Sequence, residues 1–478
     1  MKQIILLIST CLTVSLAGAQ PFAMGDNTSE ADYAKVLKAA DRATRDLADL
    51  PTSYSLRKYA PAPMNQGDYG TCVAWSAGYA ARTISYAIQR NMTNKDSINK
   101  YAFSPGYLYY KIKANDDVNC KKGSNINQAM GVMSKTGIML KKEGLVDCTR
   151  NISDSAEKEK AAPYKIKDFV SICESFETIT KNDILKMKKS LLENNPVVIS
   201  FKVYNSFFKV SASGLWTPVD NDGYQGAHGM CVVGYNDTTA GGAFEIMNSW
   251  GKGWGNGGFA WITYNQLMKY GKFAVEMMDA ETRELTAGPE ILSGNMEFIK
   301  LDETTMPVRR VKVNTRSITV EDDESADYSL YKFTETYFGG QSFKIKFSTN
   351  APSYIYVFGE DEKGIVSRLF PYNSTISAAI NSTNATYYLP SETKHARLSK
   401  GYGKENICVL YSKSEIDFDA LMNYIGSGNI TIYQGVKDKL ANRLLDIKEV
   451  KFGDDKISFE APAEEKSVLC FFVELEHH

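Results

Sequence analysis

Three residues in the first half of the chain have side chains suited to nucleophilic catalysis, and they occur in the order cysteine, histidine, asparagine. Cys72 lies in "NQGDYGTCVAW", where a glycine-broken loop gives way to an apolar helical pattern. His228 lies in "GAHGMCVVGYND" and is the only histidine before His395. Asn248 follows 20 positions later (248 − 228) in "MNSWGKGWGNGG". Each residue alone would be read as structural, but together they indicate a nucleophile, its base and a group that orients the base.

The chemistry of this trio depends on forming a sulfur anion. A free thiol has a pKa of about 8.5, and only the thiolate is strongly nucleophilic. The predicted position of Cys72 at a helix N-terminus favours the anion, and His228 as an imidazolium would favour it further. Asn248 can accept a hydrogen bond from the second ring nitrogen, which orients the imidazole without adding a charge. The sequence therefore predicts a thiolate–imidazolium pair.

Gln66 precedes the cysteine by six positions (72 − 66) and adds a hydrogen-bond donor. Attack of a thiolate on a peptide carbonyl creates an oxyanion, which the side-chain amide of Gln66 and the backbone N–H of Cys72 could stabilise. Taken alone, Gln66 would be read as a solvated loop residue. His228 would then protonate the leaving amine, and water would hydrolyse the acyl-enzyme.

These segments resemble the papain-like cysteine peptidases, over about residues 52–280. The resemblance implies that Gly123, in "CKKGSNINQAMGVMSKTGI", presents backbone to the substrate. It also implies that Trp250 shields the histidine–asparagine hydrogen bond from water. The sequence departs from the family pattern at Val73, where the family usually has tryptophan, and at Tyr69, where it often has a second cysteine. Neither departure removes a reacting group.

The order of helical and strand-like segments along the chain predicts an α+β fold with more than one domain. An α-rich first half and a β-rich second half of the peptidase part suggest the two lobes of a papain-like domain, one helical and one a β-barrel. An all-β domain is expected to follow, with the form of a sandwich. The expected boundaries are a signal peptide at 1–19, a short pro-segment at 20–51, the peptidase domain at 52–283, a linker at 284–306 and the β-sandwich at 307–476.

Two local expectations bear on this organisation. The stretch "EADYAKVLKAADRATRDLADL" within the pro-segment has the composition of a helix. In the C-terminal part, alternating runs including "NITIYQG" predict strands, with one helical insert near "DFDALMNYI". The stretch "APSYIYVFGEDEKGIVSRLFPY" resembles a domain of unknown function appended to exported bacterial proteins, and no ligand follows from it.

Composition limits the partners. The formal net charge of −1 gives no electrostatic case for nucleic acid. No metal-ligand spacing is present, so no cofactor is expected, and no later segment is long enough to span a membrane. The leader predicts export to the periplasm, cell surface or medium of a bacterium. Without Cys11, seven cysteines remain, and Cys120 and Cys148 are the candidate disulfide.

Three functions are compatible with these features. The first is an exported cysteine endopeptidase, made as a zymogen, acting on proteins or peptides. The second is a catalytically silent binding or adhesion protein on a peptidase scaffold, against which the presence of all four site residues argues. The third is a transpeptidase or cell-wall amidase, whose families generally use other spacings.

Overall fold

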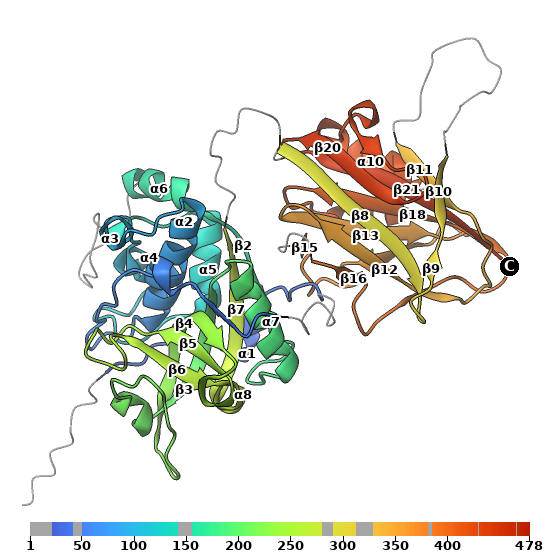
Figure 1. The fold of residues 1–478 in the computed structure, drawn as a ribbon. Helices are drawn as coiled ribbons and strands as arrows, with labels where there is room; N and C mark the ends of the chain where they lie inside the picture. The colour runs from blue at the N-terminus through green and yellow to red at the C-terminus, as the bar shows by residue number, and fades with distance from the viewer. Residues whose placement is uncertain are drawn as a thin grey trace, which may run out of the picture.

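The structure, a computed structural model, describes residues 22–41, 50–141, 155–279, 290–311, 328–380, 385–428, 430–464 and 466–478. The predicted signal peptide and Cys148 lie outside these residues. The described chain forms two bodies joined side by side, one of mixed helices and strands and one built almost entirely of strands (Figure 1).

The helices of the first body surround one buried helical segment. This segment begins at Cys72 and continues through a π-helix, η3 (Ala74–Arg82), into α2 (Thr83–Gln89). All nine residues of η3 are buried, because helices pack around it on one side and the sheet of the same body packs on the other. Side chains cap the neighbouring helices: Ser104 caps α4 and Asn125 caps α5. The helices packed nearby are α3 (Lys95–Lys100), α4 (Pro105–Ile112) and α5 (Ile126–Lys135).

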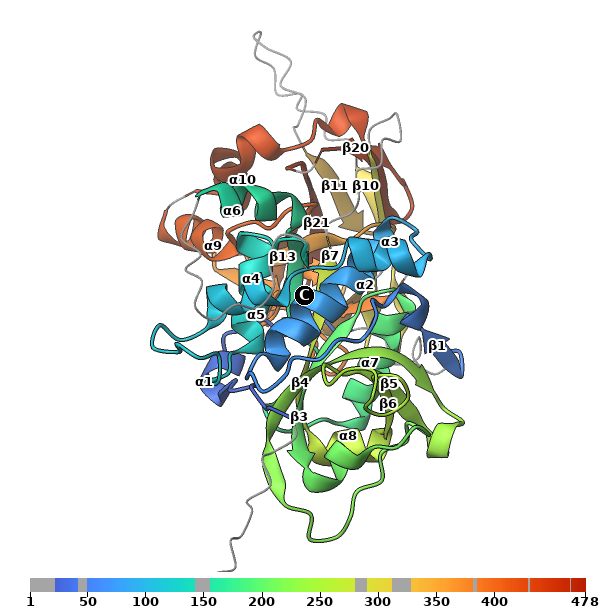
Figure 2. The same ribbon diagram turned by 90° about the vertical axis from the view of Figure 1, so that its left-hand side faces the viewer.

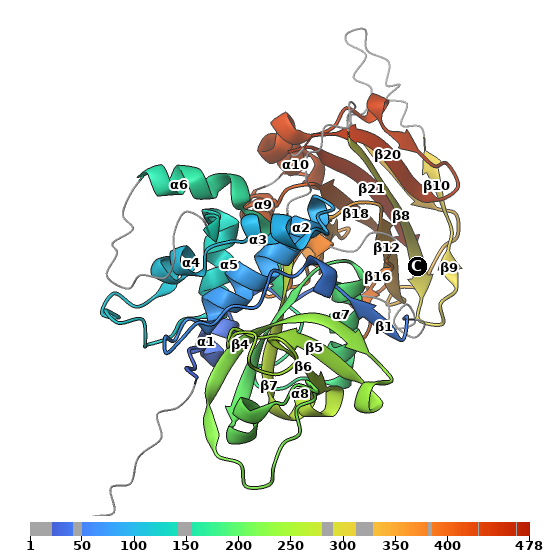
Figure 3. The ribbon, with the colours of Figure 1, turned by 60° about the vertical axis from the view of Figure 1, so that its left-hand side comes forward.

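A seven-stranded sheet forms the other side of this body. Its order is β2-β7-β3-β4-β5-β6, with β1 paired to β4. The strands are β1 (Ser53–Ser55), β2 (Ile166–Ser171), β3 (Val197–Tyr204), β4 (Tyr224–Asn236), β5 (Ala243–Met247), β6 (Phe259–Thr263) and β7 (Gly271–Asp279). Helices α7 (Lys181–Leu192) and α8 (Tyr264–Tyr270) pack on the sheet, and α6 (Ser155–Ala161) lies at the periphery. Figures 2 and 3 show α2, α4 and α5 grouped on one side of the body and β4, β5, β6 and α8 on the other.

The second body is a β-sandwich of two seven-stranded sheets. One sheet has the order β10-β11-β21-β18-β13-β14, with β15 paired to β13, and the other has the order β16-β12-β8-β20-β19, with β17 and β9 attached. Side chains from both sheets, such as Phe298 of β8 and Phe471 of β21, share one core. The strands are β8 (Glu290–Lys300), β9 (Thr305–Met306), β10 (Val308–Val311), β11 (Ser329–Phe333), β12 (Ser342–Thr349), β13 (Ser353–Glu360), β14 (Val366–Phe370), β15 (Ala379–Ile380), β16 (Tyr387–Leu389), β17 (Ala396–Arg397), β18 (Gly403–Ser412), β19 (Lys451–Phe452), β20 (Ile457–Ala463) and β21 (Val468–His477).

The structure corrects two expectations in the C-terminal half. The linker expected at 284–306 contains β8, which pairs with both β12 and β20 and is therefore an interior strand of the sandwich. The run "NITIYQG", expected as a strand, contributes to helix α10 (Ile432–Leu440), which packs against α9 (Phe418–Ser427). Thr431 caps α10, and its buried residues Ile432, Val436 and Leu440 recur every fourth position.

The pro-segment also differs from the expected long helix. Only α1 (Glu30–Tyr33) is helical, and residues 37–41 are extended, while 42–49 lie outside the described residues. The chain leaves the helix because Lys38 forms parallel bridges to two partners, Ser171 of the first body and Ile376 of the second. Tertiary pairing therefore overrides helix propensity here.

The two bodies share a packed interface beside β2. Val170 and Met278 of the first body belong to the same hydrophobic cluster as Tyr354 and Tyr356 of the second. The Lys167 ammonium also donates to the Pro352 carbonyl at 2.9 Å. Within the described residues, no helix has the length and apolar character needed to cross a membrane.

Candidate active site

Cys72 lies at the start of the buried helical segment and faces strand β4. Its sulfur accepts a hydrogen bond from the backbone N–H of Gly229 at 3.4 Å. Because Gly229 has no side chain, strand β4 can lie close to the helical segment that begins at Cys72. A Cβ at Gly229 would lie 2.9 Å from the Ser76 hydroxyl and 3.4 Å from the Val73 Cα. The residue directly before this glycine is His228, so the helix start and the histidine strand meet at this point.

His228 is held by the turn that follows β5. Its Nε2 is 2.8 Å from the Asn248 Oδ1, which also accepts the Ser249 backbone N–H at 2.7 Å. The Trp250 ring packs 4.7 Å from the imidazole, centroid to centroid, and is buried. The imidazole Nδ1 has no hydrogen-bond partner among the described residues, so it is the ring nitrogen left for proton exchange with Cys72.

Gln66 joins the site through the loop that precedes the helix. Its backbone N–H donates to the Ser249 carbonyl at 2.8 Å, and its Oε1 accepts the Ser249 hydroxyl at 2.5 Å. The neighbouring Asn65 forms an antiparallel bridge with Trp250. The loop carrying Gln66 and the turn carrying Asn248 are therefore one hydrogen-bonded unit, which fixes their relative positions.

Burial keeps both the thiol and the imidazole neutral in this arrangement. Burial raises the pKa of the Cys72 thiol to about 12. Hydrogen bonds from the backbone of Gly229, Gly25 and Val73 offset this rise only in part. Burial also lowers the pKa of His228 to about 4, against the raising effect of the Asn248 hydrogen bond. The form favoured here thus differs from the ion pair expected from the sequence, and the cause is the chain that covers the site.

Residues 22–28 pass directly through the site and cover it. The Ser124 N–H donates to the Gly25 carbonyl at 2.8 Å, and the Asn27 N–H donates to the Ser124 carbonyl at 3.0 Å. On the opposite wall the Asp26 N–H donates to the Ala227 carbonyl at 3.2 Å. The covering segment is therefore hydrogen-bonded both to the helical side and to the sheet side, one residue away from His228.

The side chains and glycines of the covering segment match the site closely. The Phe22 ring stacks on Trp250 with centroids 4.6 Å apart and planes within 7°. The Ala23 carbonyl accepts from the Gln66 Nε2 at 3.2 Å, so it uses the amide predicted to stabilise an oxyanion. A Cβ on Gly25 would lie 2.1 Å from the Gly70 carbonyl oxygen, so only glycine fits there.

Gly123 lies beside the covering segment, and its role in presenting backbone to a substrate stays a prediction. It has φ +80°, and a Cβ on it would lie 2.6 Å from the Gly25 carbonyl oxygen. The hydrogen bonds to the covering segment come from its neighbour Ser124. Cys120 nearby is disulfide-bonded. Its expected partner Cys148 lies outside the described residues, so that pairing stays a prediction.

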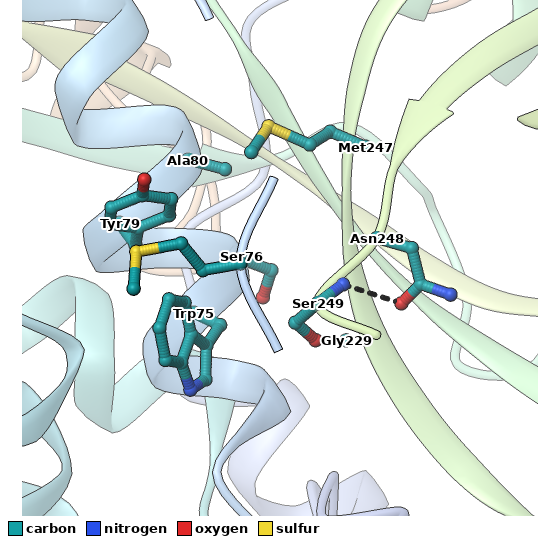
Figure 4. Close-up of a pocket in the computed structure, with 9 residues that line it drawn as sticks. Trp75, Ser76, Tyr79, Ala80, Gly229, Met247, Asn248 and Ser249 are labelled. Carbon is teal, nitrogen blue, oxygen red and sulfur yellow. Dashed lines mark hydrogen bonds between the residues drawn. The ribbon is translucent and has the colours of Figure 1, made fainter. Parts of the chain in front are cut away.

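A small cavity of about 10 Å³ remains beside the site, under the Asn248–Ser249 turn. Figure 4 shows that Trp75 and Ser76 from the helix and Met247 from β5 approach it from opposite sides. The volume is that of about one water molecule. It is too small for a peptide side chain, and the space above Cys72 is taken by the covering segment.

Sequence reasoning identified Cys72, His228 and Asn248, which the structure brings together, but it missed the groups that hold them. Ser249 and the Gly229 N–H have no signature of their own, since hydroxyls and backbone amides occur throughout the chain. The covering residues Phe22 and Gly25 were also missed, although the expected pro-segment contained them. The glycine between Met24 and Asp26 in "FAMGD" was the one local signal for a close backbone approach.

The chain is similar to known cysteine proteases over the part that carries this site. Residues 50–278 match the family model described as papain family cysteine protease, and residues 336–415 match DUF4384, a domain of unknown function. A peptidase C1-like protein of Acanthamoeba polyphaga mimivirus is 25% identical over 235 residues, which cover 45% of this chain and 69% of that protein. Vignain of Vigna mungo is 25% identical over 235 residues, covering 48% of this chain and 59% of vignain.

Solved structures of similar proteins include xylellain, a cysteine protease from Xylella fastidiosa. It is 22% identical, with a TM-score of 0.44, and the match covers 54% of this chain and 96% of xylellain. Over residues 50–278, just under half of its length, the chain is therefore similar to the papain family of cysteine proteases. The sandwich that follows includes the domain of unknown function.

Proposed function

We propose that the protein is a cysteine endopeptidase in which Cys72 is the nucleophile, His228 the general base and acid, and Asn248 the residue that positions the imidazole. The observation that carries this proposal is the hydrogen bond from His228 to Asn248 beside a helix-start cysteine. The family match supports the reaction class. Substrates are proteins or peptides.

The reaction follows from the geometry once the covering segment leaves. Water then reaches Cys72 and His228, so the burial that keeps them neutral is relieved, and the proton moves from the sulfur to Nδ1 of the imidazole. The thiolate attacks the peptide carbonyl, and the oxyanion receives hydrogen bonds from the Gln66 Nε2 and the Cys72 backbone N–H. His228 donates its proton to the leaving amine, and water releases the acyl group from the sulfur.

The same covering segment supports synthesis as a latent zymogen. Residues 22–28 occupy the place where a peptide would lie over Cys72, and they use the Gln66 donor and the Trp250 face. A peptide substrate cannot bind until these contacts are lost. Removal or displacement of the segment would therefore activate the enzyme. Export, proposed from the leader sequence at 1–19, is tested by the location of the native protein in fractionated cells.

Gln66→Ala is expected to lower kcat/KM by about 100- to 1000-fold, because it removes one of two oxyanion donors. The variant also loses a contact to the covering segment through the Ala23 carbonyl, so activity is compared on activated protein. Initial rates on a fluorogenic peptide measure the effect. Gln128→Ala, an exposed change on α5, is the matched control. A Gln66→Ala enzyme within threefold of the control would remove Gln66 from the mechanism.

The labelling rate of Cys72 distinguishes an active peptidase from a catalytically silent binding protein with the same fold. In an activated protein, iodoacetamide should modify Cys72 quickly at slightly acidic pH, where an ordinary thiol reacts poorly. Analysis of the products, hydrolysis against ligation, separates a peptidase from a transpeptidase.

A further inference from the structure

The covering segment places one acidic side chain, Asp26, in a buried position on the sheet side of the site. Asp26 is 8% exposed, although it lies next to Gly25, whose backbone reaches the Cys72 sulfur. A buried carboxylate needs hydrogen bonds or an opposite charge to offset its lost hydration. The site supplies both.

Two groups of the peptidase body face the Asp26 carboxylate. The Ser200 hydroxyl, on β3, donates to one carboxylate oxygen. Lys272, on the neighbouring strand β7, is 9% exposed and interacts with the same carboxylate through its charge. The other carboxylate oxygen accepts the backbone N–H and hydroxyl of Thr28, at 3.0 and 2.6 Å, within the covering segment itself.

Among the described residues Lys272 forms no ion pair with Asp26 within 4 Å, so its charge acts on that carboxylate over a longer distance. The Lys272 ammonium lies over the Phe176 ring, 4.8 Å from its centroid. The same ammonium is 3.5 Å from the Thr28 carbonyl oxygen and 3.6 Å from a Glu177 carboxylate oxygen. Glu177 has a shorter ion pair with Lys202, at 2.7 Å. When the covering segment leaves, two lysines and one glutamate remain, so this part of the site loses its charge balance and becomes positive.

Charge and burial act against each other at this position. Burial raises the pKa of Asp26, and the hydrogen bonds from Ser200 and Thr28 and the charge of Lys272 offset this rise only in part. The site therefore reduces the cost of burying an acidic group but offers no such compensation to an apolar or basic one. A basic side chain would meet Lys272 directly.

We propose that Ser200 and Lys272 form a specificity site for an acidic substrate side chain close to the cleaved bond, and that Asp26 occupies this site in the latent form. The proposal deepens the proposed peptidase function and rests on it. Lys272 is the residue that sets the preference, because it supplies the charge, while Ser200 supplies a directional hydrogen bond. Substrates would be peptides or proteins cleaved beside aspartate or glutamate.

Peptide cleavage tests the preference. The full chain and its activated form are given peptide series in which Asp, Asn, Leu or Arg is scanned through the positions around the cleaved bond. At one position we expect Asp to exceed Asn by about 10- to 100-fold in kcat/KM, the range of a charge-assisted hydrogen bond. Lys272→Met should bring that ratio near one, while the exposed Lys269→Met on α8 should leave it unchanged.

Equal cleavage of the Asp, Asn and Leu peptides would overturn the proposal while leaving the peptidase function in place. So would an Asp preference that survives in Lys272→Met. Failure to cleave any peptide, with Cys72 labelled no faster than an ordinary thiol, would overturn the peptidase function and this inference with it. The outcomes are therefore distinct.

A double-mutant cycle tests the same contact without catalysis. Asp26→Asn and Lys272→Met, each in the full chain, should raise the labelling rate of Cys72 by about 10-fold, because each weakens the covering segment. If the two residues interact, the double variant should label no faster than either single variant. If the effects of the two substitutions on the labelling rate multiply, or if neither substitution changes that rate, the proposed interaction between Asp26 and Lys272 is overturned.

A separate observation assigns a role to the C-terminal sandwich. Lys38, near the middle of the pro-segment, donates its backbone N–H to the Thr375 carbonyl at 2.8 Å, and its carbonyl accepts the Ser377 N–H at 2.9 Å. On the other side, Ser171 of edge strand β2 donates to the Leu37 carbonyl at 2.8 Å. The pro-segment is thus a strand between two bodies.

Side chains strengthen this arrangement. Ala40 is buried in the sandwich core, and the Lys186 ammonium of α7 pairs with Asp41 at 3.2 Å. We infer that the sandwich surface at residues 375–377 binds the pro-segment and so holds the covering segment in the site. The domain of unknown function would then act as an intramolecular anchor for latency.

Backbone donors can be removed one at a time to test the anchor. Lys38→Pro deletes the N–H that bonds to the sandwich, and Ser377→Pro deletes the reciprocal donor. Both should raise the Cys72 labelling rate of the full chain by about 10-fold, whereas the exposed Lys35→Ala should not. Thermal unfolding of each variant checks that the sandwich stays folded. Unchanged labelling in two folded proline variants would overturn the anchoring role.

Discussion

Gly25→Ala is expected to activate the full chain. The new Cβ would lie 2.1 Å from the Gly70 carbonyl oxygen and 2.3 Å from its carbon, both of them backbone atoms that cannot rotate away. The covering segment must therefore shift out of the site. Overpacking costs about 1 to 3 kcal/mol, so peptidase activity and Cys72 labelling should rise on the order of 10- to 100-fold.

The matched control is Gly131→Ala on α5, where a Cβ would meet nothing within 4 Å. It should leave activity and labelling as they are in the wild type. Rates are measured on freshly purified full-length protein, before any processing, and the chain length is checked by mass spectrometry. A folded Gly25→Ala protein that stays as latent as the control would contradict the covering role of residues 22–28.

Cys72→Ala and His228→Ala, each in the Gly25→Ala background, should abolish peptidase activity. In other enzymes that act through a nucleophile and base, removing either one costs on the order of 10⁴-fold or more in kcat, and removing both costs little more. We expect the same pattern here, because neither residue can act without the other. Initial rates on a peptide substrate, with the double variant included, measure it.

Cys231→Ala is the control for simple loss of a buried thiol. Cys231 lies on the same strand as His228 and is buried, and its thiol donates to the Val232 carbonyl at 3.7 Å. It should keep most of the activity. Residual activity in Cys72→Ala equal to that of Cys231→Ala would mean that another residue performs the reaction.

The residues of the candidate site could be predicted from sequence because each lies in a short local pattern. The stretches around Cys72, His228 and Asn248 combine a functional residue with the glycines or apolar runs that build its turn, helix or strand. The structure then gives the His228–Asn248 hydrogen bond and the approach of Cys72 to Gly229. What a motif cannot give is burial, so the neutral state of the pair was not foreseen.

The errors fall where distant contacts decide the local structure. Residues 37–41 have helical composition, but their backbone pairs with Ser171 and Ile376, which no local pattern reports. The whole of β8 lies in the stretch expected as a linker, because its partners β12 and β20 are far along the chain. The "NITIYQG" run has alternating apolar residues, and only the fourfold spacing that continues to Leu440 identifies the helix.

The central claim is that Cys72 becomes a thiolate through His228 once the covering segment is displaced. The most direct measurement is the rate of Cys72 alkylation by iodoacetamide at about pH 5.5, where an ordinary thiol is almost fully protonated. It compares the wild type, Gly25→Ala, and Gly25→Ala with His228→Ala. The account predicts slow labelling in the wild type, fast labelling in Gly25→Ala, and a return to slow labelling when His228 is lost. Equally slow labelling in all three folded proteins, or fast labelling that does not depend on His228, would contradict it.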